Sequence, residues 1–449
     1  MTVCPNNNSK EYKINLSFGK QKGKEIIADF NGGQITSDAG LLLLSSINQK
    51  YHITKRISQS LSDRRDQRYT TYESEELISQ RLFQSACGYE DCNDANSLRN
   101  DPMFKIASQR EIQESLASQP TLSRLENSVS AKELYRMAQA MLELYLDTRD
   151  PVGRRIILDF DTTDDPTYGH QQLTFFHGYF GQYVYLPLLV FEGGRLVTAV
   201  LLPGNAWGGS YLVRILKRIV RQIRNRFPDI EIGIRADAGF AKPEVYEYCE
   251  QAGIGYLIGI GRNDRLEEQN EKLMQWACWL QRITGEKQRL ISSFEYQADS
   301  WSKPRRVIAK AEWQELGGNQ RFVVTNDTGA ADKLYDREYC YRGEACENRI
   351  KELKLDMQAD RLSCSDFRAN QFRLLMYGFA YWLIDLLRSE YLQGTQLATA
   401  QMGTIRLKLI KIGAQIVNSC RRVWIHLASG YPLKDLFALI VGRMGFSSA

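Results

Sequence analysis

Two aspartates, Asp159 and Asp161, follow a short apolar run in the segment 154–169 and could bind a metal ion. The run Ile156–Leu158 is too brief for a helix and rich in β-branched residues, which predicts a buried strand. Side chains two residues apart leave a strand on the same face, so both carboxylates reach one side. Turn-forming residues at 162–166 end the strand. On this stretch alone, a plain strand followed by an acidic turn is the simpler interpretation.

Asp237 has the same kind of position in the segment 231–262. Ile232 and Ile234 predict a strand, Pro243 predicts the start of a helix, and the apolar run after that helix predicts a second strand. A strand–helix–strand unit forms a parallel pair with a right-handed crossover. Asp237 is therefore expected at the carboxyl end of a strand, where open α/β sheets bind their ligands.

A later helix supplies a third carboxylate. Helix-forming residues dominate from position 344 onward, and Glu347, Lys351 and Lys354 share one helix face. An ordinary helix salt bridge would by itself explain Glu347 and Lys351. Combined with Asp161 and Asp237, however, Glu347 makes an all-oxygen site suited to Mg²⁺ or Mn²⁺. Two such ions about 4 Å apart can activate an attacking oxygen and stabilise a leaving one in phosphoryl transfer.

Composition and motifs argue against several other classes. The 449 residues carry a net charge of +5, which fits an anionic partner without requiring one. The sequence has nine cysteines without a C-x-x-C pair and only four histidines, which argues against a zinc site. The cysteine pattern also suits a reducing cytoplasm. The sequence has no P-loop run and no nucleophile-elbow serine. No signal peptide is predicted, and the apolar run 374–384 is too short to cross a bilayer, so we expect a soluble protein.

The elements around the carboxylates predict an α/β protein preceded by a helical region. Residues 37–150 have helical character, whereas 173–194 predicts two strands joined at Gly181–Gln182. An amphipathic helix at 210–227 has one apolar face, and its other face carries Arg214, Lys217, Arg218, Arg221, Arg224 and Arg226. Contact with solvent and contact with a polyanion are equally good explanations of that face. The basic cluster 62–68 is expected to be solvated surface, with phosphate contact as the alternative.

The predicted order of segments begins with a mainly helical region and continues with an interrupted catalytic domain. The boundaries are 1–150 for the helical region, 151–262 for the first catalytic part, 263–335 for a β-rich insertion, 336–395 for the last catalytic part with the glutamate helix, and 396–449 for a C-terminal α/β segment.

Several unusual runs resemble blocks of the DDE transposases of bacterial insertion sequences, specifically the insertion sequence 1380 group. These runs are LSDRRD, GYEDCND, LASQPTLSRLEN, LDFDTTDDPTYG, FFHGYF, RADAGFA, ENRIKELK and ANQFRLL. The resemblance implies an RNase H-like catalytic domain with a β insertion before the last catalytic residue. It also implies a metal-binding catalytic triad of Asp161, Asp237 and Glu347. The threonine pair at 162–163 favours Asp161 over Asp159 as the first member.

The spacing around the glutamate departs from the related Y-(2)-R-(3)-E-(6)-K signature. Tyr339, Arg342, Glu347 and Lys354 fit it except that four residues, not three, separate Arg342 from Glu347. Glu344, which also has a lysine seven residues further on, stays a lesser candidate for the third carboxylate.

The resemblance implies a Mg²⁺-dependent transposase, with Mn²⁺ as a substitute. It would bind terminal inverted repeats through the helical N-terminal region, cleave the DNA ends and join the 3′-OH ends to target DNA. Arg342 and Lys354, grouped with Tyr339 and Lys351, would contact phosphates near the scissile bond. A homodimer on double-stranded DNA in the bacterial cytoplasm is expected, with no membrane partner. A DNA-binding protein that has lost catalysis, and a nuclease without strand transfer, stay open as alternatives.

Trp301 is the residue chosen for a contact with an unpaired base at the cleaved end. It lies in the polar stretch ADSWSKPRR beside three basic residues, in the insertion. An exposed aromatic ring near the active site could stack on such a base. The prediction requires Trp301 to be exposed and close to the triad.

Overall fold

The structure is a computed structural model that describes residues 15–149, 153, 155–206 and 209–446; the side chains at 209, 210, 344 and 345 are outside this description. At its centre is a mixed sheet in which five strands run in the order β8, β7, β4, β9, β10. Their bounds are Arg195–Leu202, Gln182–Glu192, Arg155–Thr162, Glu231–Ala236 and Gly255–Ile260.

The directions of these five strands identify the fold. β8, β7 and β4 are antiparallel neighbours, whereas β4, β9 and β10 are parallel. The parallel pair β9–β10 is connected by α9 (Pro243–Gln251), whose first residue is the predicted helix-starting proline. This order and these directions are those of an RNase H-like sheet, which confirms the predicted fold class.

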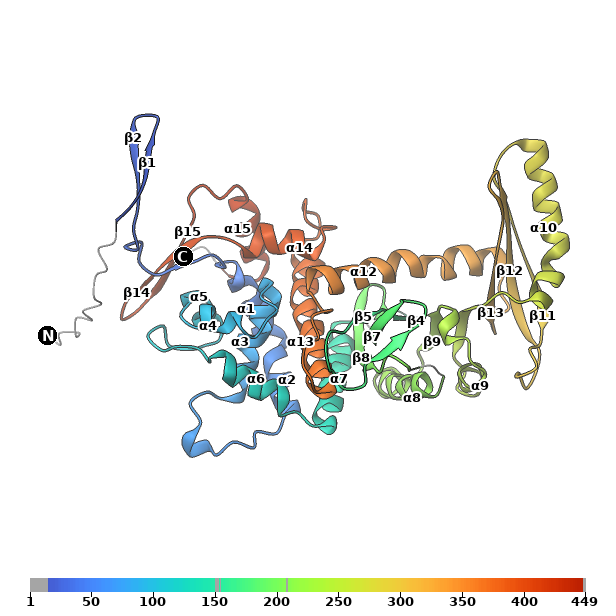
Figure 1. The fold of residues 1–449 in the computed structure, drawn as a ribbon, viewed down its shortest axis with the longest axis horizontal. Coiled ribbons are helices and arrows are strands. Elements are labelled where there is room, and N and C mark those ends of the chain that lie inside the picture. Colours follow the sequence, from blue (N-terminus) through green and yellow to red (C-terminus); the bar gives the residue numbers. More distant parts are fainter. Residues whose placement is uncertain (1–14, 150–152, 154, 207–208, 447–449) are drawn as a thin grey trace.

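Helices cover both faces of the sheet, and two neighbouring residues of β7 show which helix covers each face. Leu188 lies in a cavity with Leu212 of α8 (Gly209–Arg226), whereas Leu189 lies with Ile350 and Leu353 of a long helix at 331–356. Because side chains alternate along a strand, α8 and the long helix lie on opposite faces. Figure 1 shows this arrangement, with the long helix running along the sheet from the insertion to α13 (Phe367–Leu386).

The predicted β-rich insertion extends the sheet instead of forming a separate one. α10 (Asp264–Thr284) is followed by β11 (Gln288–Tyr296), β12 (Arg305–Gln314) and β13 (Gly317–Thr325), and β13 pairs antiparallel with β10. α10 is a helix of 21 residues within this β-rich segment. Its start is fixed by the side chain of Asn263, which accepts a hydrogen bond from the backbone N–H of Leu266.

The helical region predicted for the N-terminal part packs around α13, which is almost entirely buried. Its helices are α1 (Leu41–Tyr51), α2 (Ile53–Ser60), α3 (Ser74–Cys87), α4 (Asp94–Leu98), α5 (Pro102–Ala107), α6 (Gln119–Asn127) and α7 (Ala131–Thr148). The buried indole of Trp382 on α13 donates to the carbonyl of Leu196 on β8. α13 thereby joins the helical region to the catalytic sheet.

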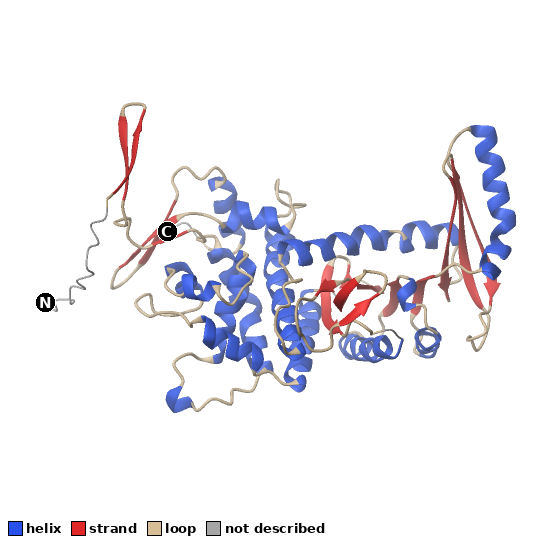
Figure 2. Cartoon of the chain, in the orientation of Figure 1, coloured by secondary structure: helices blue, strands red, loops and turns tan. Residues whose placement is uncertain are grey.

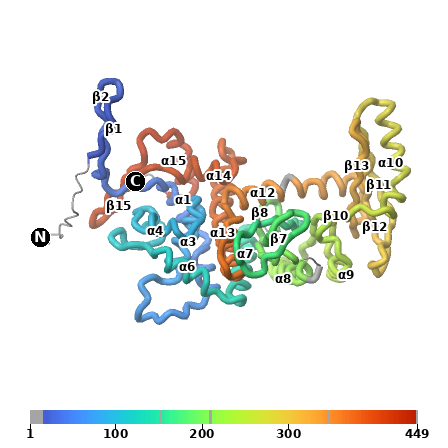
Figure 3. Tube along the Cα trace, viewed as in Figure 1, coloured from blue at the N-terminus to red at the C-terminus, as the bar shows by residue number. Residues whose placement is uncertain are grey.

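The first and last described segments of the chain, blue and red in Figure 3, lie side by side. The C-terminal segment contains α14 (Met402–Ile405), β14 (Ala414–Asn418), β15 (Val423–Leu427) and α15 (Lys434–Arg443). β14 pairs with β3 (Ile35–Thr36), so the predicted N-terminal and C-terminal segments share a sheet. An exposed hairpin of β1 (Leu16–Gln21) and β2 (Lys24–Ala28) projects beyond them in Figure 2.

The predicted domain boundaries are not tested by this packing and stay predictions. Among the described helices, none has both the length and the apolar character needed to cross a membrane.

Candidate active site

Asp161 and Asp237 are carried by adjacent parallel strands. Phe160 of β4 lies opposite Ala236, the last residue of β9. Asp161 and Asp237 are the residues that directly follow them. Neighbouring strands lie about 4.8 Å apart, which makes the two carboxylates neighbours at the carboxyl edge of the sheet. The structure therefore brings together the first two members of the predicted triad, and their catalytic role stays a prediction.

Asp159, the alternative to Asp161, has a structural partner. It is fully buried and receives two hydrogen bonds from Arg235, Nε to Oδ1 at 2.6 Å and Nη2 to Oδ2 at 2.7 Å. The remaining nitrogen of Arg235, Nη1, donates to the carbonyl of Glu338 on the long helix at 2.7 Å. A carboxylate held on both oxygens by a buried guanidinium has little capacity left for a metal ion. Asp159 fastens the long helix to the sheet, and Asp161 is the better candidate.

The long helix carries Glu347 and alternates α-helical with π-helical turns. α11 (Ala331–Lys333) and α12 (Asn348–Lys351) alternate with π turns at Leu334–Tyr339, Gly343–Glu347 and Glu352–Asp356. Within one π turn the N–H of Cys340 donates to the carbonyl of Tyr335, five residues earlier, at 2.9 Å. A π turn holds one residue more than an α turn.

The π turn at Gly343–Glu347 gives a physical reason for the unusual spacing of this segment. Glu347 is the fifth residue after Arg342, with four residues between them. Residues i and i+5 lie on one side of a π turn, as residues i and i+4 do in an α-helix. The extra residue is taken up locally, so Arg342 and Glu347 stay on one side. The side chain of Glu344, the lesser candidate, lies outside the described residues.

Arg342 lies against Asp161. Its Nη1 donates to Oδ2 of Asp161 at 3.0 Å, and both side chains are mostly buried. Burial raises the pKa of Asp161 to about 6; Arg342 opposes that rise, and the negative charges of Asp237 and Glu347 add to it. Asp161 is therefore electrostatically coupled to both other members of the predicted triad.

The donor set fits a hard divalent cation in its chemistry, because it consists of carboxylate oxygens. Within the described residues, no three carboxylate, imidazole or thiol groups converge closely enough to hold an ion. Asp161 instead forms an ion pair with the guanidinium of Arg342. A cation on Oδ2 of Asp161 would compete with that guanidinium.

The other predicted phosphate-binding residues of the long helix differ in their surroundings. Lys354 is bound to Oδ1 of Asp164 at 2.8 Å and to the hydroxyl of Thr163 at 3.3 Å, whereas Lys351 is exposed. The hydroxyl of Tyr339 lies only 2.6 Å from the point where a Cβ at Gly259 would be. Gly259 of β10 therefore leaves room for Tyr339 to reach the carboxyl edge. Asp164, a partner of Lys354, was not singled out from the sequence, although it belongs to the same acidic turn as Asp161.

The cations of α8 lie on the opposite face of the sheet from the long helix, and several rest on aromatic rings. Arg214 lies 4.9 Å from the ring centre of Tyr211, Lys217 lies 5.3 Å from that of Tyr248, and Arg218 lies 4.6 Å from that of Tyr135. Arg221 is exposed. The charged groups remain at the surface while the aliphatic parts of these side chains pack against the protein, so phosphate contact by this face stays a prediction.

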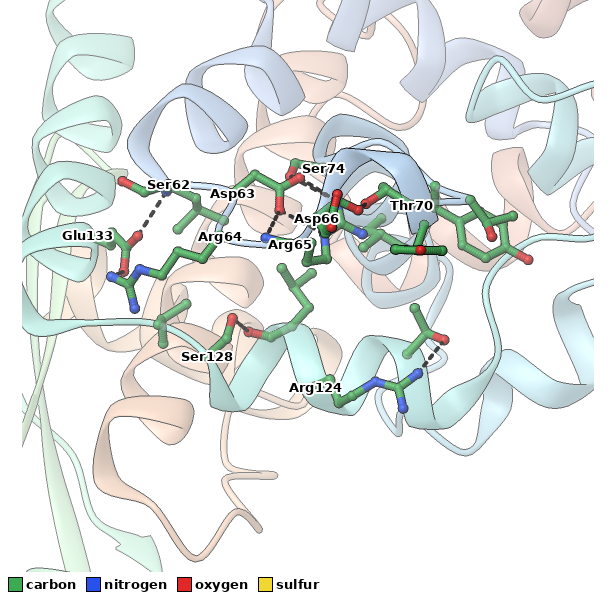
Figure 4. Close-up of a pocket in the computed structure, with 18 residues that line it drawn as sticks. Ser62, Asp63, Arg64, Arg65, Asp66, Thr70, Ser74, Arg124, Ser128 and Glu133 are labelled. Atoms are coloured by element: carbon green, nitrogen blue, oxygen red, sulfur yellow. Dashed lines mark hydrogen bonds and ion pairs between the residues drawn. The ribbon is translucent and has the colours of Figure 1, made fainter.

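The basic cluster 62–68 is neutralised by its own neighbours. Arg65 pairs with Asp63 and Arg68 with Asp66, both at 2.6 Å. Arg64 pairs with Glu133 at 3.3 Å, and Figure 4 shows Asp63, Arg64, Arg65, Asp66 and Glu133 around a cavity of about 440 Å³. Each of these cations has a carboxylate partner, as expected for a solvated surface, and phosphate contact by this cluster stays the alternative.

The prediction for Trp301 is wrong. Its side chain is only 6% exposed and is packed edge-on against Tyr246 and Tyr296, with ring centres 5.4 Å away in each case. Arg305, one of the basic residues that suggested a DNA contact, lies over the indole and is itself held by Glu250. Trp301 is a core residue despite its polar local sequence, because its aromatic partners come from α9 and β11.

A cavity of about 490 Å³ beside Asp237 was not predicted. It lies between the turn after β6 (Phe175–His177), the start of α8 and the loop after β9, and Thr162 and Asp237 belong to its lining. Tyr179, Phe180 and Tyr211 contribute aromatic rings to the same lining. The run FFHGYF at 175–180, with four aromatic residues around one turn, was the signal that could have revealed it.

The strand order and directions define the class of RNase H-like proteins. The sequence matches the family described as Transposase DDE domain group 1 over residues 18–447, and the chain belongs to this family. A comparison with curated protein sequences finds no significant match.

Among solved structures, the chain is similar to the piggyBac transposase in a synaptic complex with hairpin DNA, at 10% identity and a TM-score of 0.42 over 84% of this chain and 80% of that one. It is also similar to the Mos1 transposase in a paired-end complex with the left transposon end, at 10% identity and a TM-score of 0.18 over 44% of this chain and 60% of that one. At these TM-scores the fold class depends on the strand order and directions, not on the likeness.

Proposed function

We propose that this transposase belongs to the insertion sequence 1380 group and that it binds the terminal inverted repeats of its element, cleaves the DNA ends and joins the 3′-OH ends to target DNA. The observation that carries the proposal is the register that sets Asp161 and Asp237 next to each other at the carboxyl edge of parallel strands, with the helix of Glu347 held against Asp161 by Arg342. Carboxylates that raise one another's affinity for positive charge are suited to a divalent cation.

Asp161, Asp237 and Glu347 would hold Mg²⁺, for which Mn²⁺ would substitute. The bound ions would activate the attacking oxygen and stabilise the leaving oxygen of the DNA phosphate. Arg342, released from Asp161, would donate to a phosphate oxygen near the scissile bond, because guanidinium binds phosphate as readily as carboxylate. Tyr339, Lys351 and Lys354 come from the same helix and would position the strand.

Recognition of the DNA ends would fall to the helical N-terminal region, with Arg214, Lys217, Arg218 and Arg221 of α8 following the phosphate backbone. We expect a homodimer on double-stranded DNA, located with the nucleoid in the bacterial cytoplasm. The net charge of +5 supports a polyanionic partner.

The experiment uses the DNA that flanks the coding region, including any inverted repeats found there. Wild-type protein with Mg²⁺ should nick this DNA and transfer its 3′ ends to a second duplex. Asp161→Ala, Asp237→Ala and Glu347→Ala should each abolish cleavage while gel-shift binding stays largely intact. Glu268→Gln on α10 removes an exposed carboxylate far from the triad and serves as the matched control.

The same assay separates the alternatives. Binding without cleavage by the wild-type protein would indicate a DNA-binding protein that has lost catalysis. Cleavage without strand transfer would indicate a nuclease. Full cleavage by any one of the three alanine variants would remove that residue from the triad.

A further inference from the structure

We propose that the cavity beside Asp237 binds a single unstacked nucleobase of the DNA strand that is being processed. This inference rests on the proposed function, because it takes DNA as the substrate. The cavity measures about 490 Å³, within the range of about 300–1,000 Å³ typical of small-molecule sites.

The first argument is the chemistry of the walls. Tyr179, Phe180 and Tyr211 present aromatic rings, Phe240 and several leucines provide an apolar lining, and Thr162 and His177 add polar side chains to that of Asp237. Flat aromatic walls with a few polar groups suit a nucleobase, whose faces are apolar and whose edges form hydrogen bonds. Stacking of this kind tolerates any base, so the site would not require one sequence.

The second argument is exposure. Tyr179 at the tip of the turn is 86% exposed and Tyr211 is 41% exposed, although large aromatic side chains are usually buried. Phe176 and Tyr183 of the neighbouring strands are exposed as well and contact each other edge-on. A group of exposed aromatic rings on one surface indicates a binding face.

The third argument is position. Asp237 belongs both to the cavity wall and to the candidate active site, so a base in the cavity would be attached to a nucleotide next to the carboxylates. Arg214 lies 4.9 Å from the ring centre of Tyr211, one of the lining residues, and supplies a positive charge for the adjoining phosphate. A base inside a duplex has both faces covered by its stacked neighbours, so only an unstacked base offers a free face to these rings.

The test compares two DNA probes in the presence of EDTA, so that neither is cut. One is a fully paired duplex, and the other has the same sequence with one unpaired 2-aminopurine. Wild-type protein should prefer the unpaired probe and quench its fluorescence. Tyr179→Ala and Tyr211→Ala should each reduce that preference by about 5- to 150-fold, as expected for loss of one stacking contact, with duplex affinity unchanged.

Two further variants serve as controls. Tyr179→Phe keeps the ring and should keep the preference. Tyr69→Ala removes an equally exposed tyrosine, 84% exposed, from the helical region and should also keep it.

Equal preference for the two probes in wild type, or an unchanged preference in both alanine variants, would overturn the inference. Self-association that weakens in Tyr179→Ala while the preference persists would assign this face to a second copy of the chain. Failure of wild-type protein to bind either probe would instead count against the proposed function itself.

Discussion

Arg342 and Asp161 form an ion pair across the candidate active site, with Nη1 of the arginine 3.0 Å from Oδ2 of the aspartate. The pair joins the long helix to the end of β4. It places a permanent positive charge on the carboxylate that the triad needs for a cation. A phosphate group is the natural alternative partner of a guanidinium, so DNA and metal are expected to bind together.

Removal of this guanidinium should strengthen metal binding in the absence of DNA. We expect Arg342→Ala to bind Mn²⁺ about tenfold more tightly than wild type, which corresponds to ~1.4 kcal/mol and is in keeping with loss of one charge-assisted competitor. Titration calorimetry without DNA measures the affinity. Arg349→Ala, which removes an arginine paired with Glu352 on the same helix, is the control. Equal affinities in wild type and Arg342→Ala would show that the pair does not compete with metal.

The π turn at Gly343–Glu347 should tolerate the loss of one residue. Deletion of Ala345 is expected to convert this turn to an α turn while Arg342 and Glu347 stay on one side of the helix. The shortened protein should retain cleavage activity. Deletion of Arg349 from the α-helical turn Asn348–Lys351 should abolish it, since Lys354 would rotate by about 100° relative to Glu347.

Alanine substitutions distinguish the two candidates for the third carboxylate. Glu344→Ala should cleave DNA nearly normally and Glu347→Ala should not. The reverse pattern, with Glu344→Ala inactive and Glu347→Ala active, would transfer the role to Glu344.

DNA binding should weaken steeply with salt through the cations of α8. Replacement of Arg218 and Arg221 by alanine is expected to reduce the log–log salt slope by about one for each lost phosphate contact. Replacement of Arg65 and Arg68 should leave the slope unchanged, because each is already paired with an aspartate. Filter binding across a salt series measures both. An unchanged slope in the α8 variant would assign that face to solvent.

Asp165 should make the stability of the protein depend on pH. Burial raises the pKa of its carboxyl to about 9; the charge of Asp360 adds to this rise and Lys354 opposes it. The unfolded chain releases this proton near 3.8, so the folded state binds more protons between the two values. The stability that this group contributes is therefore lost as pH rises through that window.

Asp165→Asn keeps a neutral side chain at every pH and should raise Tm relative to wild type at about pH 8, with a much smaller effect at about pH 4. Thermal unfolding at both values tests this. Glu268→Gln, at an exposed site, should shift Tm by the same small amount at each pH. A Tm difference for Asp165→Asn that is identical at the two values would contradict the burial argument.

The sequence by itself determined where the carboxylates lie along the chain. The apolar runs before Asp161 and Asp237 specify strands, and local periodicity is enough to place an aspartate at a strand end. The same reasoning predicted the strand–helix–strand unit of β9, α9 and β10, the helix of Glu347 and the basic face of α8. These features depend on neighbouring residues, which a sequence shows directly.

Only the tertiary structure decided which groups meet. Asp159 acquires Arg235 because β4 and β9 pair in that register, and Trp301 is buried because α9 and β11 bring tyrosines to it. The cavity beside Asp237 likewise combines a turn, a helix and a strand end that are distant in sequence. Burial and charge pairing depend on distances in space, so no local pattern could show that Asp159 is held by Arg235 or separate an exposed tryptophan from a core one.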